Sequence, residues 1–172
     1  VREVCESSAA WDVDLLRRSL ALGADPQWTN AWRHCGPQWE LLGEKPLPAH
    51  MALRRSDPAF LEALASAGAS LWKPSLDGRS IQQWLGADEA GLKWVELGGD
   101  PWREDSEGAC LALAAARGAG SVYWGKLLAH PSAICAFEAP KPSKGFASIG
   151  CCCVGWSNLE ALIALENFGY PF

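Results

Sequence analysis

Histidine and cysteine are the side chains in this sequence that could perform nucleophilic or metal chemistry, and their spacing favours neither. The chain has three histidines and seven cysteines among 172 residues. His34 precedes Cys35, but adjacent residues rarely face each other as a nucleophile and its base must. Consecutive helical residues point about 100° apart, so Cys151, Cys152 and Cys153 cannot jointly bind one tetrahedral metal ion. We expect these three side chains to point inward and pack as small apolar groups.

No other catalytic motif is present. The Gly118-Ala119-Gly120 segment lacks both the pattern and the preceding strand of a phosphate-binding loop. The carboxylates are distributed as on solvated helix faces and hairpin tips, and they form no acid–base pair. The cysteine spacings support neither a disulfide framework nor a zinc site, which favours free thiols in a reducing compartment. We therefore expect a cytoplasmic protein that is not an enzyme and needs no cofactor or metal.

Composition narrows the class of protein further. Apolar residues make up 49% of the chain and charged residues 20%, which is typical of a folded soluble domain. The net charge of −5 argues against nucleic acid and against anionic membrane surfaces as partners. No apolar run reaches the length that spans a bilayer. A signal peptide removed before Val1 stays an open alternative.

A short phrase built around glycine recurs and indicates the architecture. Gly23, Gly68, Gly98 and Gly169 each follow an amphipathic helical stretch, and a short extended run follows three of them. Glycine ends helices well because it adopts positive φ without strain. Helical stretches that end this way at intervals predict an array of helical repeats.

The segment from Leu47 to Ser80 shows one repeat nearly complete. It begins with Leu-Pro-Ala-His-Met-Ala, continues through the helix start Ser56-Asp57-Pro58, and spans about 33 residues, the ankyrin period. The segment closely resembles the ankyrin-repeat family. The resemblance places His50 on the family's histidine, whose usual role is a hydrogen bond to the backbone of a neighbouring repeat.

Weaker segments continue the pattern, so the resemblance implies an all-α solenoid of about five helix–turn–helix repeats in a single domain, 1–172. In the last repeat, Ser157-Asn158-Leu159-Glu160 predicts a capping box at the start of the final helix. The extra length falls in two loops that join repeats. The predicted repeats are 1–28, 47–79, 80–109, 110–131 and 148–172, with insertions at 28–45 and 132–146.

Ten tryptophans are a large excess, and the repeat phase divides nine of them. Three fall where the family has buried aliphatic residues, and three follow a closing glycine, where they could stack as a ladder. Two lie in the first insertion and one on a first helix, where binding a partner and local packing are equally open alternatives. In that order, the residues are Trp84, Trp94 and Trp124; Trp28, Trp72 and Trp102; and Trp32, Trp39 and Trp156.

The resemblance implies a concave face of hairpin tips and first helices, whose positions free of packing encode specificity. They include a basic spot at Arg54 and Arg55 and an acidic strip that would attract a protein with a basic surface. The alternative is an ordinary solvated face. The predicted partner-binding residues are Trp32, Trp39, Arg54, Arg55, Leu76, Asp77, Arg79, Asp88, Glu104, Ser106, Glu107, Arg117 and Trp156; Asp105 completes the acidic strip.

These observations favour a non-catalytic protein that binds one specific protein partner through its concave face. Its small size and degenerate repeats suit an inhibitor or immunity protein that neutralises a toxin or an enzyme. The alternative is a docking or substrate-targeting domain of a larger enzyme or effector. A small-molecule enzyme would require a convergent polar cluster in a deep pocket, which the repeat phase does not provide.

Overall fold

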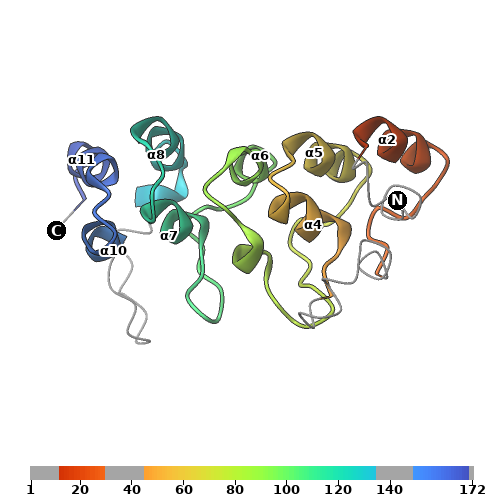
Figure 1. The fold of residues 1–172 in the computed structure, drawn as a ribbon, viewed down its shortest axis with the longest axis horizontal. Helices are drawn as coiled ribbons and strands as arrows, with labels where there is room; N and C mark the ends of the chain where they lie inside the picture. Colours follow the sequence, from red (N-terminus) through yellow and green to blue (C-terminus); the bar gives the residue numbers. More distant parts are fainter. Residues whose placement is uncertain (1–11, 30–44, 135–148, 171–172) are drawn as a thin grey trace. The chain divides into compact units, whose positions relative to one another are not determined.

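The computed structural model describes residues 12–29, 45–134 and 149–170, and every regular element in these ranges is a helix (Figure 1). The predicted all-α class is therefore confirmed for the described part of the chain. The chain divides into two compact units, Val1–Trp84 and Leu85–Phe172. Within the described ranges, no helix is both long enough and apolar enough to cross a bilayer.

The first unit is built on a helical hairpin. Helix α4 (Pro48–Arg54) and helix α5 (Pro58–Ser66) form the hairpin, α2 (Val13–Ala21) packs against α5, and the 3-10 helix η2 (Ile81–Trp84) packs against α4. Apolar side chains from all four elements fill the core. Those with almost no exposed surface are Leu16, Met51, Leu53, Phe60, Leu61, Leu64 and Ile81.

Local sequence signals explain where α5 begins and ends. The Asp57 carboxylate accepts a hydrogen bond of 2.9 Å from the backbone N–H of Phe60, and Pro58 occupies the first turn. Both are favourable because the first turn of a helix has N–H groups without helical partners. After the helix, Gly68 adopts φ +85°, a conformation that glycine reaches without strain. Residues at its two ends therefore determine where α5 begins and ends.

The second unit has two hairpins and one preceding helix. Helix α6 (Glu89–Glu96) comes first, then α7 (Leu111–Ala116) with α8 (Ser121–Leu128), then α10 (Ile149–Gly155) with α11 (Leu159–Phe168). Helix α10 packs against α7, and α11 packs against α8 (Figure 1). The two hairpins thus stack with their first helices, α7 and α10, together and their second helices, α8 and α11, together.

The start of α11 corrects one prediction. The N-cap is Asn158, whose side-chain oxygen accepts a 3.1 Å hydrogen bond from Ala161 N–H; Ser157 precedes the cap with φ +56°. The predicted capping box from Ser157 is therefore wrong, and Glu160 instead accepts a 2.7 Å bond from Ser121 N–H of α8. The Asn158 amide also reaches carbonyls at the end of α7, Ala119 being nearest at 3.2 Å. The cap thus joins two hairpins.

The predicted burial of three tryptophans is confirmed. Trp84, Trp94 and Trp124 are buried. A side chain on Gly99 would overlap the ring of Trp94, so the absence of a Cβ there makes room for the larger ring. In the segment predicted as the third repeat, 80–109, the helical element before α6 is the single 3-10 turn η2.

The predicted tryptophan ladder joins residues with unlike surroundings. Trp102 is buried, its ring lies 6.2 Å from that of Trp124 at 50°, and its indole N–H donates to the Leu127 carbonyl at 3.1 Å. Trp72, in contrast, is 44% exposed. Trp102 is thus a core residue of the second unit, and the ladder stays a prediction.

Candidate functional site

In the first unit, three chemically versatile side chains lie close to the ring system of Trp84. The His50 ring stacks on it with centroids 5.4 Å apart and planes 25° apart. The guanidinium carbons of Arg54 and Arg79 lie 5.9 and 6.0 Å from the centroid of its ring system, within cation–π range. The sequence predicted Trp84 only as a core residue. Its second role depends on a contact between segments about 30 residues apart, which no local pattern reveals.

Two elements bring these side chains together. Helix α4 places His50 and Arg54 four residues apart, on one helical face. The hairpin that follows α5 supplies Arg79, since Ser75 N–H donates to the Arg79 carbonyl at 2.9 Å and the Ser75 hydroxyl closes the turn. Arg79 also pairs with the Asp77 carboxylate at 3.1 Å. Despite some desolvation, the pKa of Asp77 is lowered by the Ser75 hydroxyl, backbone donors and Arg79.

His50 is neutral in this setting. Its Nδ1 accepts a 3.0 Å hydrogen bond from Leu47 N–H, which places the ring proton on Nε2. Burial lowers the pKa of His50 to about 4, against smaller opposing effects of the Lys73 backbone and of Asp77. The predicted bond from histidine to backbone exists, but its partner is the start of the same helix. A neutral, buried and stacked imidazole supports packing rather than proton transfer.

The second unit presents a closely similar hairpin with different chemistry. Asp105 N–H donates to the Ala109 carbonyl at 3.0 Å, and the Asp105 carboxylate accepts from Ala109 N–H at 2.8 Å. Asp105 therefore holds the turn, as Ser75 does in the first unit. Glu104 and Glu107 flank it on the surface. Of the predicted acidic strip, these two carboxylates are the ones exposed to solvent.

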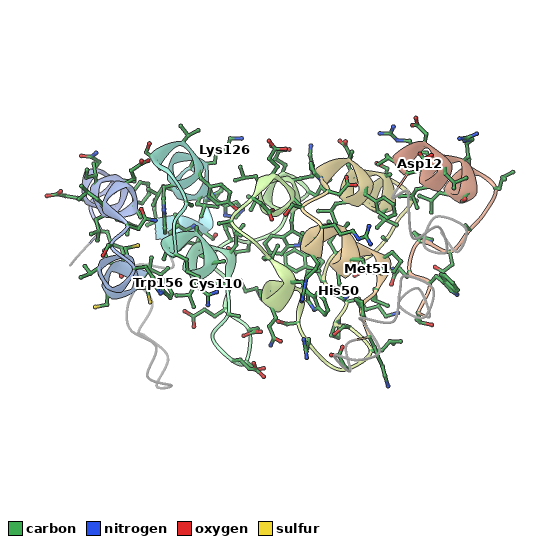
Figure 2. The ribbon with its side chains drawn as sticks, in the orientation of Figure 1. Asp12, His50, Met51, Cys110, Lys126 and Trp156 are labelled. Carbon is green, nitrogen blue, oxygen red and sulfur yellow. The ribbon has the colours of Figure 1, made fainter. Side chains whose placement is uncertain are left out.

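Arg117 and Trp156, both predicted to contact a partner, lie together. Arg117 follows α7 and Trp156 follows α10, the two first helices that pack against each other. The guanidinium carbon stands 5.3 Å from the centroid of the Trp156 ring system, which is 42% exposed beside α10 (Figure 2). Stacking orients a guanidinium while leaving its N–H groups available to carboxylate acceptors. The pair forms an exposed, aromatic and cationic spot.

No protein-family model matches this chain, and no curated protein is significantly similar to it.

The remaining predicted site residues are placed as follows. Asp88 is the N-cap of α6, where its carboxylate accepts from Gly91 N–H at 2.9 Å, so this acidic side chain has a structural role. Arg55 and Ser106 are exposed, and Leu76 at the hairpin tip is 46% exposed. Trp32 and Trp39 lie outside the described residues.

One cluster missed by the sequence analysis contains serine, histidine and aspartate. The Ser132 hydroxyl donates to the Asp100 carboxylate at 2.6 Å, and His130 Nδ1 lies 2.6 Å from the same hydroxyl. In a nucleophilic triad the histidine stands between serine and carboxylate and removes the serine proton. Here the serine stands in the middle, and its hydroxyl donates a hydrogen bond to the aspartate. Asp100 also accepts from Trp102 N–H at 3.0 Å, so the cluster ties two loops together.

The cysteine prediction is partly wrong. Cys153 is buried, but Cys152 is only half-buried and Cys151 is exposed, because neighbouring helical residues cannot share one face. The four cysteines in the described ranges, Cys110 and Cys151 to Cys153, are free thiols. Burial raises the pKa of Cys110 and of Cys153 to about 11, which disfavours nucleophilic thiolates. The described ranges contain no metal-binding group of three or more His, Cys, Asp or Glu.

Proposed function

We propose that this chain is a non-catalytic ankyrin-type module that binds a specific protein through its first helices and hairpin tips. The stacked pair of Arg117 and Trp156 carries the proposal. A half-exposed tryptophan with a guanidinium over its ring combines the two side chains most enriched at interface hot spots. The pair stands where α7 and α10 end, and both residues are among those expected from the sequence to contact a partner.

The surrounding charges favour a protein partner with a basic patch near the hairpin of the second unit. Glu104 and Glu107 are exposed on that hairpin, while Asp105 between them is occupied with its turn. Exposed rim carboxylates steer a basic partner during encounter more than they hold it afterwards. The net charge of −5 agrees with this polarity. An inhibitor or immunity role, in which the module covers a toxin or an enzyme, is the form of this function that we favour.

The first experiment identifies the partner and tests the face at once. The immobilised chain captures binding proteins from its native source, and mass spectrometry identifies them. Parallel baits carry Arg117→Ala with Trp156→Ala, or Lys126→Ala on the exposed side of the second helix α8. We expect the double variant to lose the captured protein and the Lys126 variant to retain it. Equal capture by all three baits would contradict the proposed face.

A second measurement tests the predicted polarity. Charge reversals Glu104→Lys and Glu107→Lys should slow association with the captured protein severalfold and change its dissociation little. Added salt should reduce the difference between wild type and variant, because exposed charges are screened. Faster association of the reversed variant would indicate an acidic partner surface instead.

A further inference from the structure

The hairpin α10–α11 has apolar residues at two positions that are buried in the other two hairpins. In each of three hairpins the second helix has a defined N-cap: Asp57, Gly120 and Asn158. The residue four positions before the cap and the residue four positions after it can therefore be compared directly. This comparison uses each hairpin's own internal positions.

These two positions are fully buried in the other hairpins. In α4–α5 they hold Leu53 and Leu61, and in α7–α8 they hold Ala116 and Trp124; none of the four is more than 1% exposed. Helices α10 and α11 pack against α7 and α8, and the Trp124 ring also lies 6.2 Å from that of Trp102, which precedes α7. The pattern of a covered hairpin is thus apolar at both positions.

In α10–α11 the same two positions are apolar but open. Val154, four residues before the cap, is 62% exposed, and Leu162, four residues after it, is half-buried. Leu159, one turn before Leu162, is 65% exposed. Ile163, directly after Leu162, is 48% exposed. We call Val154, Leu159, Leu162 and Ile163 the terminal face. Apolar side chains gathered on an exposed surface mark an interaction site.

The charged residues beside the terminal face indicate which kind of partner it binds. From Ile149 to Phe168 the only charged side chains are Glu160 and Glu166. Glu160 reaches back to Ser121 N–H of α8, whereas Glu166 lies one turn beyond Leu162 and Ile163 on the same side of α11. Two copies of this face would bring acidic groups together without a basic group to pair them, so a second copy of the chain is disfavoured.

We propose that the terminal face binds an amphipathic helix of a partner protein whose apolar stripe is flanked by lysine or arginine. The apolar stripe takes the place that α10 and α11 take on α7 and α8. A basic side chain of the partner then pairs with Glu166. This surface consists of other residues than the Arg117–Trp156 spot, and its occupancy does not depend on the function proposed above.

Synthetic helical peptides test the proposal without knowledge of the natural partner. The probe is a fluorescein-labelled peptide with leucine at one helical stripe and lysine elsewhere, and a second probe has glutamate in place of lysine. Fluorescence anisotropy gives the dissociation constant for the full chain. The double variant Val154→Lys, Ile163→Lys alters the terminal face. Val122→Lys is the matched control, since Val122 is a 78% exposed apolar residue of α8.

We expect the lysine peptide to bind at least tenfold more tightly than the glutamate peptide. The terminal-face variant should weaken it at least tenfold, and Val122→Lys less than twofold per charge added. Equal weakening by both variants per added charge would show that net charge alone attracts the peptide and would overturn the proposal. Sedimentation of the free chain supplies the remaining outcome: a dimer dispersed by Val154→Lys, Ile163→Lys would assign the face to a second copy. Circular dichroism of each variant confirms folding.

Discussion

The hairpins α4–α5 and α10–α11 share a backbone design but differ in what covers them. Both pass through a serine with positive φ, 54° at Ser56 and 56° at Ser157, immediately before an Asx N-cap. Yet four residues before the cap, Leu53 is 1% exposed and Val154 is 62% exposed. The comparison shows that chain direction and helix ends are fixed locally, while the energetic weight of an apolar residue depends on its neighbours.

The largest expected contrast tests that difference in weight. Leu53→Ala should lower the free energy of unfolding by about 2–5 kcal/mol, because it leaves a cavity in a closed core. Val154→Ala should change it by less than about 0.5 kcal/mol, because the side chain is already largely in water. Urea unfolding of both variants measures the contrast. A loss above about 2 kcal/mol for Val154→Ala would show that this face is covered in the free protein.

The second prediction concerns the pH dependence of stability that His50 causes. His50 lies seven residues before the N-cap of α5, and the residue seven positions before the N-cap of α11 is Cys151. The pKa of His50 lies at about 4 in the fold, below its ordinary value of 6.5. The unfolded chain therefore takes up the proton first as pH falls. The stabilisation is complete above about pH 6.5 and is lost progressively down to pH 4, by about 3 kcal/mol.

Denaturant titrations at several pH values check this dependence, with His50→Gln as the control. The glutamine variant lacks the proton-binding site and should lose about 3 kcal/mol less than wild type between pH 7 and pH 4. Parallel pH profiles for the two proteins would show that folding does not lower the pKa of His50, and would contradict this prediction.

The two N-caps should differ because one of them also joins hairpins. Asp57→Ala removes one cap bond, at a cost of about 1 kcal/mol. Asn158→Ala removes the cap bond to Ala161 and leaves the carbonyls of Ala116 and Ala119, at and just after the end of α7, without its amide donor, at a cost of about 2 kcal/mol. Thermal and urea unfolding compare the variants. A smaller loss for Asn158→Ala than for Asp57→Ala would contradict the joining role.

The smallest effect tests what the hairpins share. Replacing Ser56 or Ser157 with glycine relieves a left-handed conformation but adds freedom to the unfolded chain. We expect a net gain of about 0.5 kcal/mol in each case, and the two gains should agree within about 0.5 kcal/mol. A gain at one site with a loss at the other would show that the two turns differ in strain.

Much of the fold could be predicted from the sequence because its signals are local. Asp57 with Pro58 predicts the start of α5, and Gly68 predicts its end. The capping error at Ser157 has a physical reason, since an Asx residue directly after serine competes for the same role. The cysteine run could not be oriented correctly by phase alone, because only one of three consecutive residues can face the core.

The candidate site could be predicted in part. Arg117 and Trp156 follow from the phase of the helices, although their stacking depends on how α10 packs against α7. The arginine pair over Trp84, the structural roles of Asp88 and Asp105, and the Ser132 cluster all depend on contacts across turns or between distant segments. Such contacts leave no periodic trace in the sequence.

The affinity of Trp156→Ala for the captured protein tests the proposed function most directly. Isothermal titration calorimetry compares wild type, Trp156→Ala and Lys126→Ala, each checked for folding by circular dichroism. We predict a loss of about 2 kcal/mol, or about 30-fold in Kd, for Trp156→Ala and less than twofold for Lys126→Ala. Unchanged affinity for Trp156→Ala together with a large loss for Lys126→Ala would place the interface on the second helices and contradict the account.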